Sequence, residues 1–163
     1  DKRVGSKQLK SFEKEVAAMH LLNHPNIIKH IDSFEDNENF QIVMGYVDGG
    51  DLQKLIENGA VDELVGVRIL YQPLLALNEI HKKKIVHKDI KPENILLDSE
   101  GNVKLADFGI AKILEYEGDV GTTMAYSMDY GAPELQRGEV RHEVRHLQCR
   151  CRGIQNVRWL SPV

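Results

Sequence analysis

The sequence predicts an α+β fold, in which helices and short strands occupy separate stretches of one chain. Apolar residues recur at helical spacing in residues 11–22 and again in residues 65–81. Two pairs of short apolar segments, each pair separated by a polar turn, are typical of hairpins. With 163 residues and 42% hydrophobic content, the chain can form one packed core.

The first predicted helix spans residues 11–22 and places Ser11 at its N-cap, although Lys14 stands where a capping box has Glu. The His-Pro-Asn sequence at residues 24–26 ends this helix, because the residue before a proline avoids helical backbone angles. The apolar positions of the helix are Phe12, Val16, Met19 and Leu22.

Two strands are predicted next, at residues 27–34 and 40–43, with polar turn residues 35–39 between them. The Gly-Gly-Asp sequence at residues 49–51 then opens a short helix that begins at Leu52. The chain therefore alternates between strand and helix patterns in its first third.

The longest predicted helix, residues 65–81, carries a broad apolar stripe that we expect to be buried. The members of this stripe are Ile69, Leu70, Pro73, Leu74, Leu77 and Ile80. Residues 95–97 and 103–105 then form a predicted hairpin that delivers residues 107–109 at its end. Residues 110–131 are polar and long for a loop, which marks them as a candidate functional segment.

The overall charge excludes some partners and implies none. A net charge of -4 and a pI near 6.0 give no basic field for nucleic acid or for an anionic membrane surface. No apolar run approaches membrane-spanning length, and residues 1–14 are too charged for a secretory signal, so we expect an intracellular, cytoplasmic protein. Cys149 and Cys151 lack a second pair to complete a zinc site, so we expect free thiols.

Three short motifs carry the functional information. The sequence HKDIKPEN at residues 87–94 is followed by DFG at residues 107–109 and by APE at residues 132–134. In this order they resemble the catalytic, metal-binding and substrate-loop motifs of eukaryotic-type protein Ser/Thr kinases. The resemblance implies a two-lobed protein-kinase-like fold that uses ATP and Mg²⁺ to phosphorylate Ser or Thr of a protein substrate.

The resemblance assigns a role to each polar residue of these motifs. Asp89 is the expected base for the attacking hydroxyl, and Lys91 places a positive charge on the transferring phosphate. Asn94 and Asp107 are the expected Mg²⁺ ligands, because this cation prefers hard oxygen donors. The alternative is that Asp89 and Asn94 are ordinary turn residues.

Two further residues indicate the substrate class. Lys91, two positions after the expected base, matches the Ser/Thr-specific form of the loop. Ser127, five residues before Ala132, stands where such kinases have a hydroxyl that contacts the base. The alternative for Ser127 is a solvated loop serine, since its neighbours Tyr126 and Met128 depart from the family's usual pattern.

A second group of residues matches positions that contact the nucleotide in the family. Glu15 corresponds to the helix glutamate that pairs with the ATP-anchoring lysine, and Met44 to the residue at the back of the adenine pocket. The backbone of Gly45 and Val47 contacts the adenine edge, Asp51 the ribose, and Leu96 the underside of the base. For each of these residues the alternative is plain packing or a helix cap.

The resemblance also divides the chain. We expect residues 1–43 to be the remnant of a small lobe, residues 44–48 a hinge, and residues 49–136 part of a helical lobe. Several segments around the hinge and the DFG motif look most like the NIMA-related (NEK) kinases. A kinase-like pseudoenzyme scaffold and a non-functional truncated gene product are the rival interpretations, and the oligomeric state stays open.

Two departures from the family bear on activity. Lys88 replaces an arginine whose planar fork normally grips an activation-loop phosphate, so we expect weak dependence on phosphorylation at Thr122 or Thr123. The glycine-rich phosphate loop and the anchoring lysine belong upstream of residue 1. Glu15 therefore has no expected partner in this chain, and we expect the chain as it stands to be inactive.

The last segment, residues 137–163, does not resemble the family. All thirteen lysines lie at or before Lys112, whereas six of the eight arginines lie at or after Arg137. The genetic code allows residues 139–157 to be written so that a shift of one base yields the Asp-Ile-Tyr-Ser-x-Gly pattern of the helix that a kinase has here. We therefore expect a frameshifted tail, with a divergent basic tail as the alternative.

Overall fold

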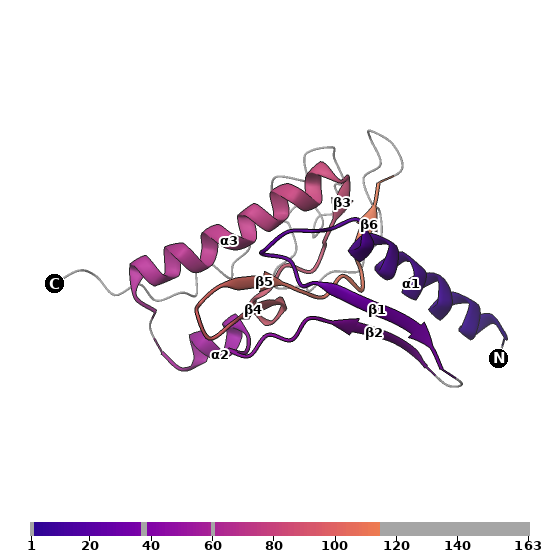
Figure 1. Ribbon diagram of the computed structural model, residues 1–163, viewed down its shortest axis with the longest axis horizontal. Coiled ribbons are helices and arrows are strands. Elements are labelled where there is room, and N and C mark those ends of the chain that lie inside the picture. The colour runs from indigo at the N-terminus through magenta and orange to yellow at the C-terminus, as the bar shows by residue number, and fades with distance from the viewer. Residues whose placement is uncertain (1, 37–38, 60, 115–163) are drawn as a thin grey trace, which may run out of the picture.

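The computed structural model describes residues 2–36, 39–59 and 61–114 (Figure 1). In chain order the elements are α1 (Lys2–His20), β1 (His30–Glu35), β2 (Phe40–Met44), α2 (Leu52–Glu57), α3 (Glu63–Lys82), β3 (Ile85–Val86), the 3₁₀ turn η1 (Pro92–Asn94), β4 (Ile95–Leu97), β5 (Val103–Leu105) and β6 (Lys112–Ile113). This mixture of helices with short antiparallel pairs confirms the predicted α+β class. No helix in these three ranges combines the length and the apolar character needed to cross a membrane.

The first helix is longer than predicted. It begins at Lys2 and not at residue 11, so Ser11 lies inside α1 as an exposed residue and is not its N-cap. The reason is that residues 7–10, Lys-Gln-Leu-Lys, are good helix formers and contain no breaker. At its other end α1 stops at His20, two residues before the predicted end and ahead of Pro25.

The first hairpin is also shifted relative to the prediction. β1 pairs antiparallel with β2, from Glu35 opposite Phe40 to His30 opposite Met44. Residues 27–29 precede β1 and are not part of it, because Ile28 donates its N–H to the carbonyl of Leu105, at the end of β5, over 2.9 Å. This start of the predicted strand is therefore a connection into the core.

The two predicted helices after the hairpin are confirmed. Asp51 caps α2 by accepting the N–H of Lys54 at 2.9 Å, and Asp62 caps α3 in the same way through Leu64. The buried face of α3 consists of Gly66, Ile69, Pro73, Ala76, Leu77 and Ile80. Leu74 was predicted in this face and is instead 46% exposed, since it lies one position round the helix from Pro73.

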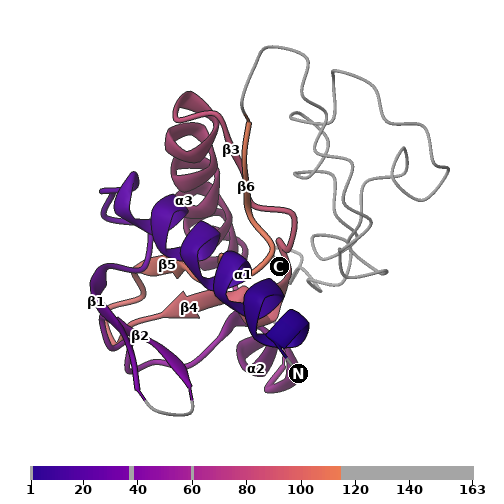
Figure 2. The same cartoon turned by 90° about the vertical axis from the view of Figure 1, so that its right-hand side faces the viewer.

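The β4–β5 hairpin lies between the two long helices. Figure 1 shows α1 with the β1–β2 hairpin towards one end of the molecule and α3 with α2 towards the other, and Figure 2 shows α1 in front of β4 and β5. β4 and β5 pair from Ile95 opposite Leu105 to Leu97 opposite Val103, as predicted. Behind them a short β3–β6 pair joins the end of α3 to the segment after residue 109. One core of buried apolar residues runs through this arrangement, from Ala18 to Phe108.

A buried amide pair joins three of these parts. Asn26 donates from Nδ2 to Gln72 Oε1 at 2.8 Å and to the carbonyl of Val103 at 3.0 Å. The same Gln72 oxygen accepts the N–H of Val103 at 2.8 Å. The segment after α1, helix α3 and strand β5 are thereby joined through one satisfied polar cluster.

Candidate active site

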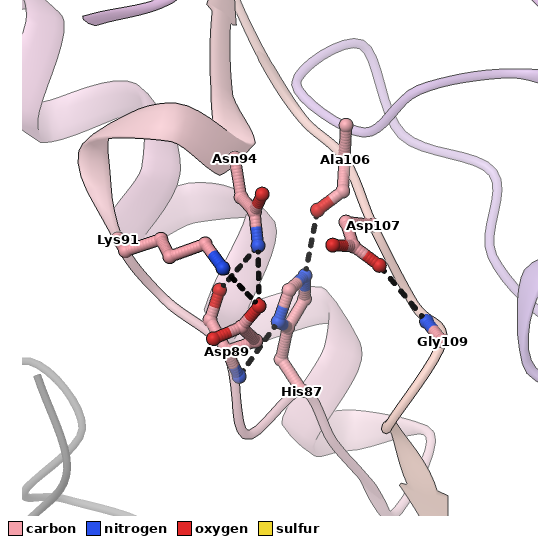
Figure 3. A network of polar contacts seen from close by, with 7 residues as sticks. All are labelled: His87, Asp89, Lys91, Asn94, Ala106, Asp107 and Gly109. Atoms are coloured by element: carbon pink, nitrogen blue, oxygen red, sulfur yellow. Dashed lines mark hydrogen bonds and ion pairs between the residues drawn. The ribbon is translucent and has the colours of Figure 1, made fainter. Parts of the chain in front are cut away.

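The predicted catalytic residues meet on one carboxylate. Asp89 Oδ2 lies 2.8 Å from Lys91 Nζ and accepts a hydrogen bond from Asn94 Nδ2 at 2.9 Å (Figure 3). Asn94 Nδ2 also donates to the Asp89 carbonyl at 2.9 Å. The hydrogen bond to Asp89 raises the pKa of Lys91, so its ammonium stays charged. A turn of six residues thus gathers a carboxylate, a cation and an amide.

The backbone explains why this turn is fixed. Pro92 begins η1, where its preset φ suits the turn and its missing N–H costs no hydrogen bond. Asn94 donates its N–H to the Lys91 carbonyl at 3.0 Å and accepts the N–H of Ala106 at 2.9 Å. The second bond attaches the catalytic turn to the end of β5, directly before Asp107.

His87 is a residue whose role the sequence analysis missed. It is fully buried and accepts the N–H of Asp89 on Nδ1 at 3.3 Å. The proton must then sit on Nε2, which donates to the carbonyl of Ala106 at 3.1 Å. Burial lowers the pKa of His87 to about 4, so the ring is neutral at physiological pH. The signals in the sequence were its place at the start of the HKDIKPEN motif and its position after two apolar residues, Ile85 and Val86.

The DFG residues point in opposite directions. Asp107 has a φ of 65° and is exposed, whereas Phe108 is buried against the His87 ring with centroids 4.7 Å apart. Gly109 donates its N–H to Asp107 Oδ1 at 3.2 Å. Lys88, beside the base, has a φ of 71°. Left-handed non-glycine residues are uncommon and gather at functional sites, and here they flank the catalytic turn on both sides.

The two predicted metal ligands fit Mg²⁺ by their chemistry. Both hydrogen bonds of the Asn94 amide nitrogen go to Asp89, which leaves the amide oxygen as the atom that can bind a cation. Figure 3 shows this oxygen on the side away from Asp89. Asp107 supplies a carboxylate, and no group of three His, Cys, Asp or Glu in the described ranges forms a metal cluster. Two protein oxygens suit Mg²⁺, which is usually shared with substrate phosphates and water.

The residues predicted to contact the nucleotide lie on two neighbouring segments. Met44 ends β2, and the following Gly45 donates its N–H to the Lys29 carbonyl at 2.8 Å. Val47 is partly buried against the core. Leu96, in the centre of β4, forms an isolated bridge with Asp51. The linker after β2 and strand β4 are therefore side by side.

Gly49 makes this approach possible. Its N–H donates to the Leu97 carbonyl at 2.8 Å, and Leu97 in turn donates to the Gly50 carbonyl at 2.8 Å. A Cβ on Gly49 would lie 2.6 Å from the Leu97 oxygen, which no side chain tolerates without a shift of the backbone. The glycine is thus required by the close contact between linker and strand.

Two further residues predicted at the nucleotide site, Asp51 and Glu15, have shifted pKa values. The N–H of Lys54 lowers the pKa of Asp51, whose carboxylate caps α2, so the alternative interpretation as a helix cap holds for this residue. Glu15 projects from α1 to Gly109, where a Cβ would lie 3.7 Å from its Oε2. Burial, and then the negative charge of Asp107, raise the pKa of Glu15.

Several predicted residues fall outside the described ranges. These are Ser127, Thr122, Thr123, the APE motif at residues 132–134, the two cysteines and the tail at residues 137–163. Their roles remain predictions.

Comparison with known proteins agrees with the geometry. The protein kinase domain family matches residues 1–145. The chain is similar to the serine/threonine-protein kinase cds1 of Schizosaccharomyces pombe, at 39% identity over 78% of this chain and 28% of cds1. It is similar to GIN4 of Saccharomyces cerevisiae, at 41% over 78% of this chain and 11% of GIN4, and to Nek1 of Mus musculus, at 38% over 82% and 11%.

These identities do not single out the NIMA-related kinases, because relatives of other kinds match equally well. The chain spans between 11% and 28% of the length of these relatives. The family match covers most of the chain, and the Asp89 cluster and the DFG turn agree with it. Together these findings are sufficient to assign the family. This chain belongs to the protein kinase domain family.

Proposed function

We propose that this chain supplies the catalytic turn and the Mg²⁺-binding turn of a protein Ser/Thr kinase, which transfers the γ-phosphate of ATP to a Ser or Thr of a protein inside the cell. The observation that carries the proposal is the convergence of Lys91 Nζ and Asn94 Nδ2 on one oxygen of Asp89. A carboxylate held in this way has a fixed position from which to accept a proton.

Each side chain contributes one physical function. Asp89 accepts the proton of the substrate hydroxyl; Asn94 and Lys91 hold its carboxylate, and His87 holds its backbone N–H. Lys91 offers a positive charge beside the base, where negative charge develops on the transferring group. Mg²⁺-ATP, when bound, supplies the phosphoryl group and a cation that neutralises its charge, with Asn94 and Asp107 as protein ligands.

The substrate class follows from two positions. Lys91 is the Ser/Thr-specific residue of the loop, and Ser127 is the proposed hydroxyl that contacts the base. The proposal includes both of these roles. It also includes the nucleotide contacts of Glu15 and Asp51 and the assignment to the NIMA-related group.

The proposal also includes the division of the chain into a small-lobe remnant, a hinge and a partial helical lobe that ends near residue 136. The family match runs to residue 145, nine residues farther. We propose a shifted reading frame from about Gly138 onwards. Sequencing the transcript decides this point: nucleotides after the Glu139 codon that do not encode Asp-Ile-Tyr-Ser-x-Gly in the next frame contradict it.

As it stands, the chain should bind nucleotide poorly, because Glu15 lies beside the carboxylate of Asp107 and this places like charges where the phosphates bind. Calorimetric titration with Mg²⁺ and ATP should give no micromolar affinity. A thermal melt of the same sample separates a folded scaffold, which melts cooperatively, from a product without a folded state.

The catalytic test uses a completed domain, in which the parts of the kinase domain that this chain does not span come from the S. pombe relative. Asp89→Asn should lower kcat by about 10²- to 10⁴-fold with little change in the KM for ATP, because the base acts on the attacking hydroxyl. Asp107→Ala should abolish transfer by removing a Mg²⁺ ligand. The measurement is transfer of radiolabel from ATP to casein.

The matched control is Asp62→Asn, a carboxylate that caps α3 and lies outside the site. Its kcat should stay within about twofold of the parent. A completed domain that binds Mg²⁺-ATP but phosphorylates no Ser or Thr would contradict the enzyme and favour a pseudoenzyme scaffold.

A further inference from the structure

A cavity of about 710 Å³ lies apart from the catalytic turn. Its walls come from the end of α1, the segment leading into β1, residues 45–47 and Lys104 of β5. Asp89, Lys91, Asn94 and Asp107 are not among its lining residues. It overlaps the proposed nucleotide contacts at Gly45 and Val47, and Met44, Asp51 and Leu96 are not among its lining residues.

The lining of this cavity is basic. Two lysines and three histidines line it, and no Asp or Glu does. The five are Lys29, Lys104, His20, His24 and His30. A concave surface lined by charges of one sign concentrates ligands of the opposite sign, although the whole chain has a net charge of -4.

One polar atom of this lining has no hydrogen-bond partner among the described residues. The Nε2 atom of His30 is buried and makes no hydrogen bond within the part of the chain that the structure describes. The His30 ring packs against His20 with centroids 4.4 Å apart. A buried polar atom without a partner destabilises the fold, and an acceptor bound in the cavity would recover this loss when Nε2 carries the proton.

Two other donors are fixed by neighbouring backbone. His24 accepts the N–H of Asn26 on Nδ1 at 3.1 Å, which leaves Nε2 as the protonated nitrogen. Lys104 donates from Nζ to the Pro25 carbonyl. Both side chains are therefore held at the wall, and their ordering costs a ligand little entropy.

The remaining lining suits an organic group. Met19, Ile27 and Ile28 are buried apolar residues at the cavity, and Tyr46 at its edge is 91% exposed. The volume is in the range of small-molecule sites, about 300–1,000 Å³. An aromatic ring on Tyr46 would gain stacking energy that a bare ion cannot obtain.

We propose that this cavity binds an aryl phosphate ester, with the phosphate on Lys29, Lys104 and His30 and the ring on Tyr46 and the apolar wall. A phosphate ester fits better than a carboxylate, because its nearly doubly negative group has three acceptor oxygens for several donors. The ester could belong to a phosphotyrosine side chain or to a small molecule.

The test is a titration of the ¹⁵N-labelled 163-residue chain with phenyl phosphate, followed by the amide shifts of Lys29 and Gly45. The shifts should saturate, and phenol and inorganic phosphate should each bind at least about tenfold more weakly. A phosphotyrosine pentapeptide that binds more tightly than phenyl phosphate assigns the site to a protein ligand, and weaker binding assigns it to a small molecule; both outcomes support the site.

Three variants complete the test. Lys29→Gln, at an exposed position, should weaken binding of phenyl phosphate by about tenfold, and His30→Phe should weaken it while keeping the ring. Lys10→Gln removes an exposed lysine of α1 outside the cavity and should leave the affinity unchanged. The proposal is overturned if Lys29→Gln and His30→Phe bind phenyl phosphate as tightly as Lys10→Gln does. Displacement by adenosine, which has no phosphate, also overturns it, because the ligand would then occupy the nucleotide site.

Discussion

The catalytic turn and the β1–β2 hairpin reverse the usual relation between polarity and burial. In the turn, the polar residues His87, Asp89 and Asn94 are all at most 8% exposed. In the hairpin, the apolar residues Ile31 and Phe34 are 58% and 44% exposed. The difference lies in the partners: the polar turn is satisfied by bonds to β5 and to itself, whereas the hairpin contacts mainly α1. Hydrogen-bond partners, and not composition alone, decide which segment is buried here.

The largest expected effect on this comparison comes from two phenylalanines. Phe108→Ala should lower the free energy of unfolding by about 3–5 kcal/mol, because it empties a buried space beside His87. Phe34→Ala, in the hairpin, should cost less than about 1 kcal/mol. Urea denaturation of both variants measures the difference, and equal costs would mean that the two regions are equally well packed.

Acid should weaken the catalytic turn selectively. His87 has a folded-state pKa of about 4 against 6.5 for the free side chain, so between these values the unfolded chain binds more protons. The stability contributed by the neutral ring is complete above about pH 6.5 and falls as the pH drops to about 4, by about 3 kcal/mol in total.

The measurement is the free energy of unfolding between pH 4 and pH 8 for the parent and for His87→Phe. The raised pKa of Glu15 acts in the opposite direction and is present in both proteins, so the difference isolates His87. The variant should be less stable at pH 8 and should have the smaller loss on acidification. Parallel pH curves would contradict a buried neutral histidine.

The contribution of the Asn94 hydrogen bonds to the stability of the turn can be measured separately. Asn94→Ala should cost about 1–3 kcal/mol, because Asp89 loses its amide donor while it remains buried. Asn78→Ala, on the exposed side of α3, removes the same group and should change stability by less than about 0.5 kcal/mol. Thermal melts of the two variants suffice, and a similar loss in both would mean that the Asn94 bonds contribute little.

The smallest effect is expected at the cap of α2. Asp51→Ala should cost about 1 kcal/mol by removing the acceptor for the Lys54 N–H. Asp51→Asn keeps an acceptor oxygen and should retain most of this stability. If the two variants melt at the same temperature below the parent, the ion pair with Lys54 and not the cap is the source of the loss.

Much of the fold could be predicted from the sequence, and the elements that were predicted wrongly have physical explanations. The Gly-Gly-Asp opening of α2 and the hairpin before the DFG motif carry their own local signals, and both are confirmed. The predicted start of α1 was wrong because residues 7–10 contain no breaker that separates them from the apolar pattern beginning at Phe12. Ile28 was wrongly placed in the first strand, because its N–H bonds to the Leu105 carbonyl, 77 residues later in the chain. A local sequence pattern cannot reveal such a contact.

At the candidate active site, too, local signals were predictive and long-range contacts were not. The motifs predicted which residues gather, and Asp89, Lys91 and Asn94 do lie together. The neutral state of His87 and the contact of Glu15 with Gly109 arise from burial and from chain segments that meet only in the fold. Such effects require tertiary structure.

The Asn26–Gln72–Val103 cluster has a consequence for how this sequence can change over evolution. Its members lie 46 and 31 residues apart, and one oxygen of Gln72 accepts from both neighbours. Replacing Gln72 alone takes the acceptor from the Val103 N–H and one of two acceptors from Asn26 Nδ2, so the effects of substitutions at these positions cannot add independently. Gln72 and Asn26 should therefore vary together among related sequences, because a change at one removes a hydrogen bond that only a matching change at the other can replace.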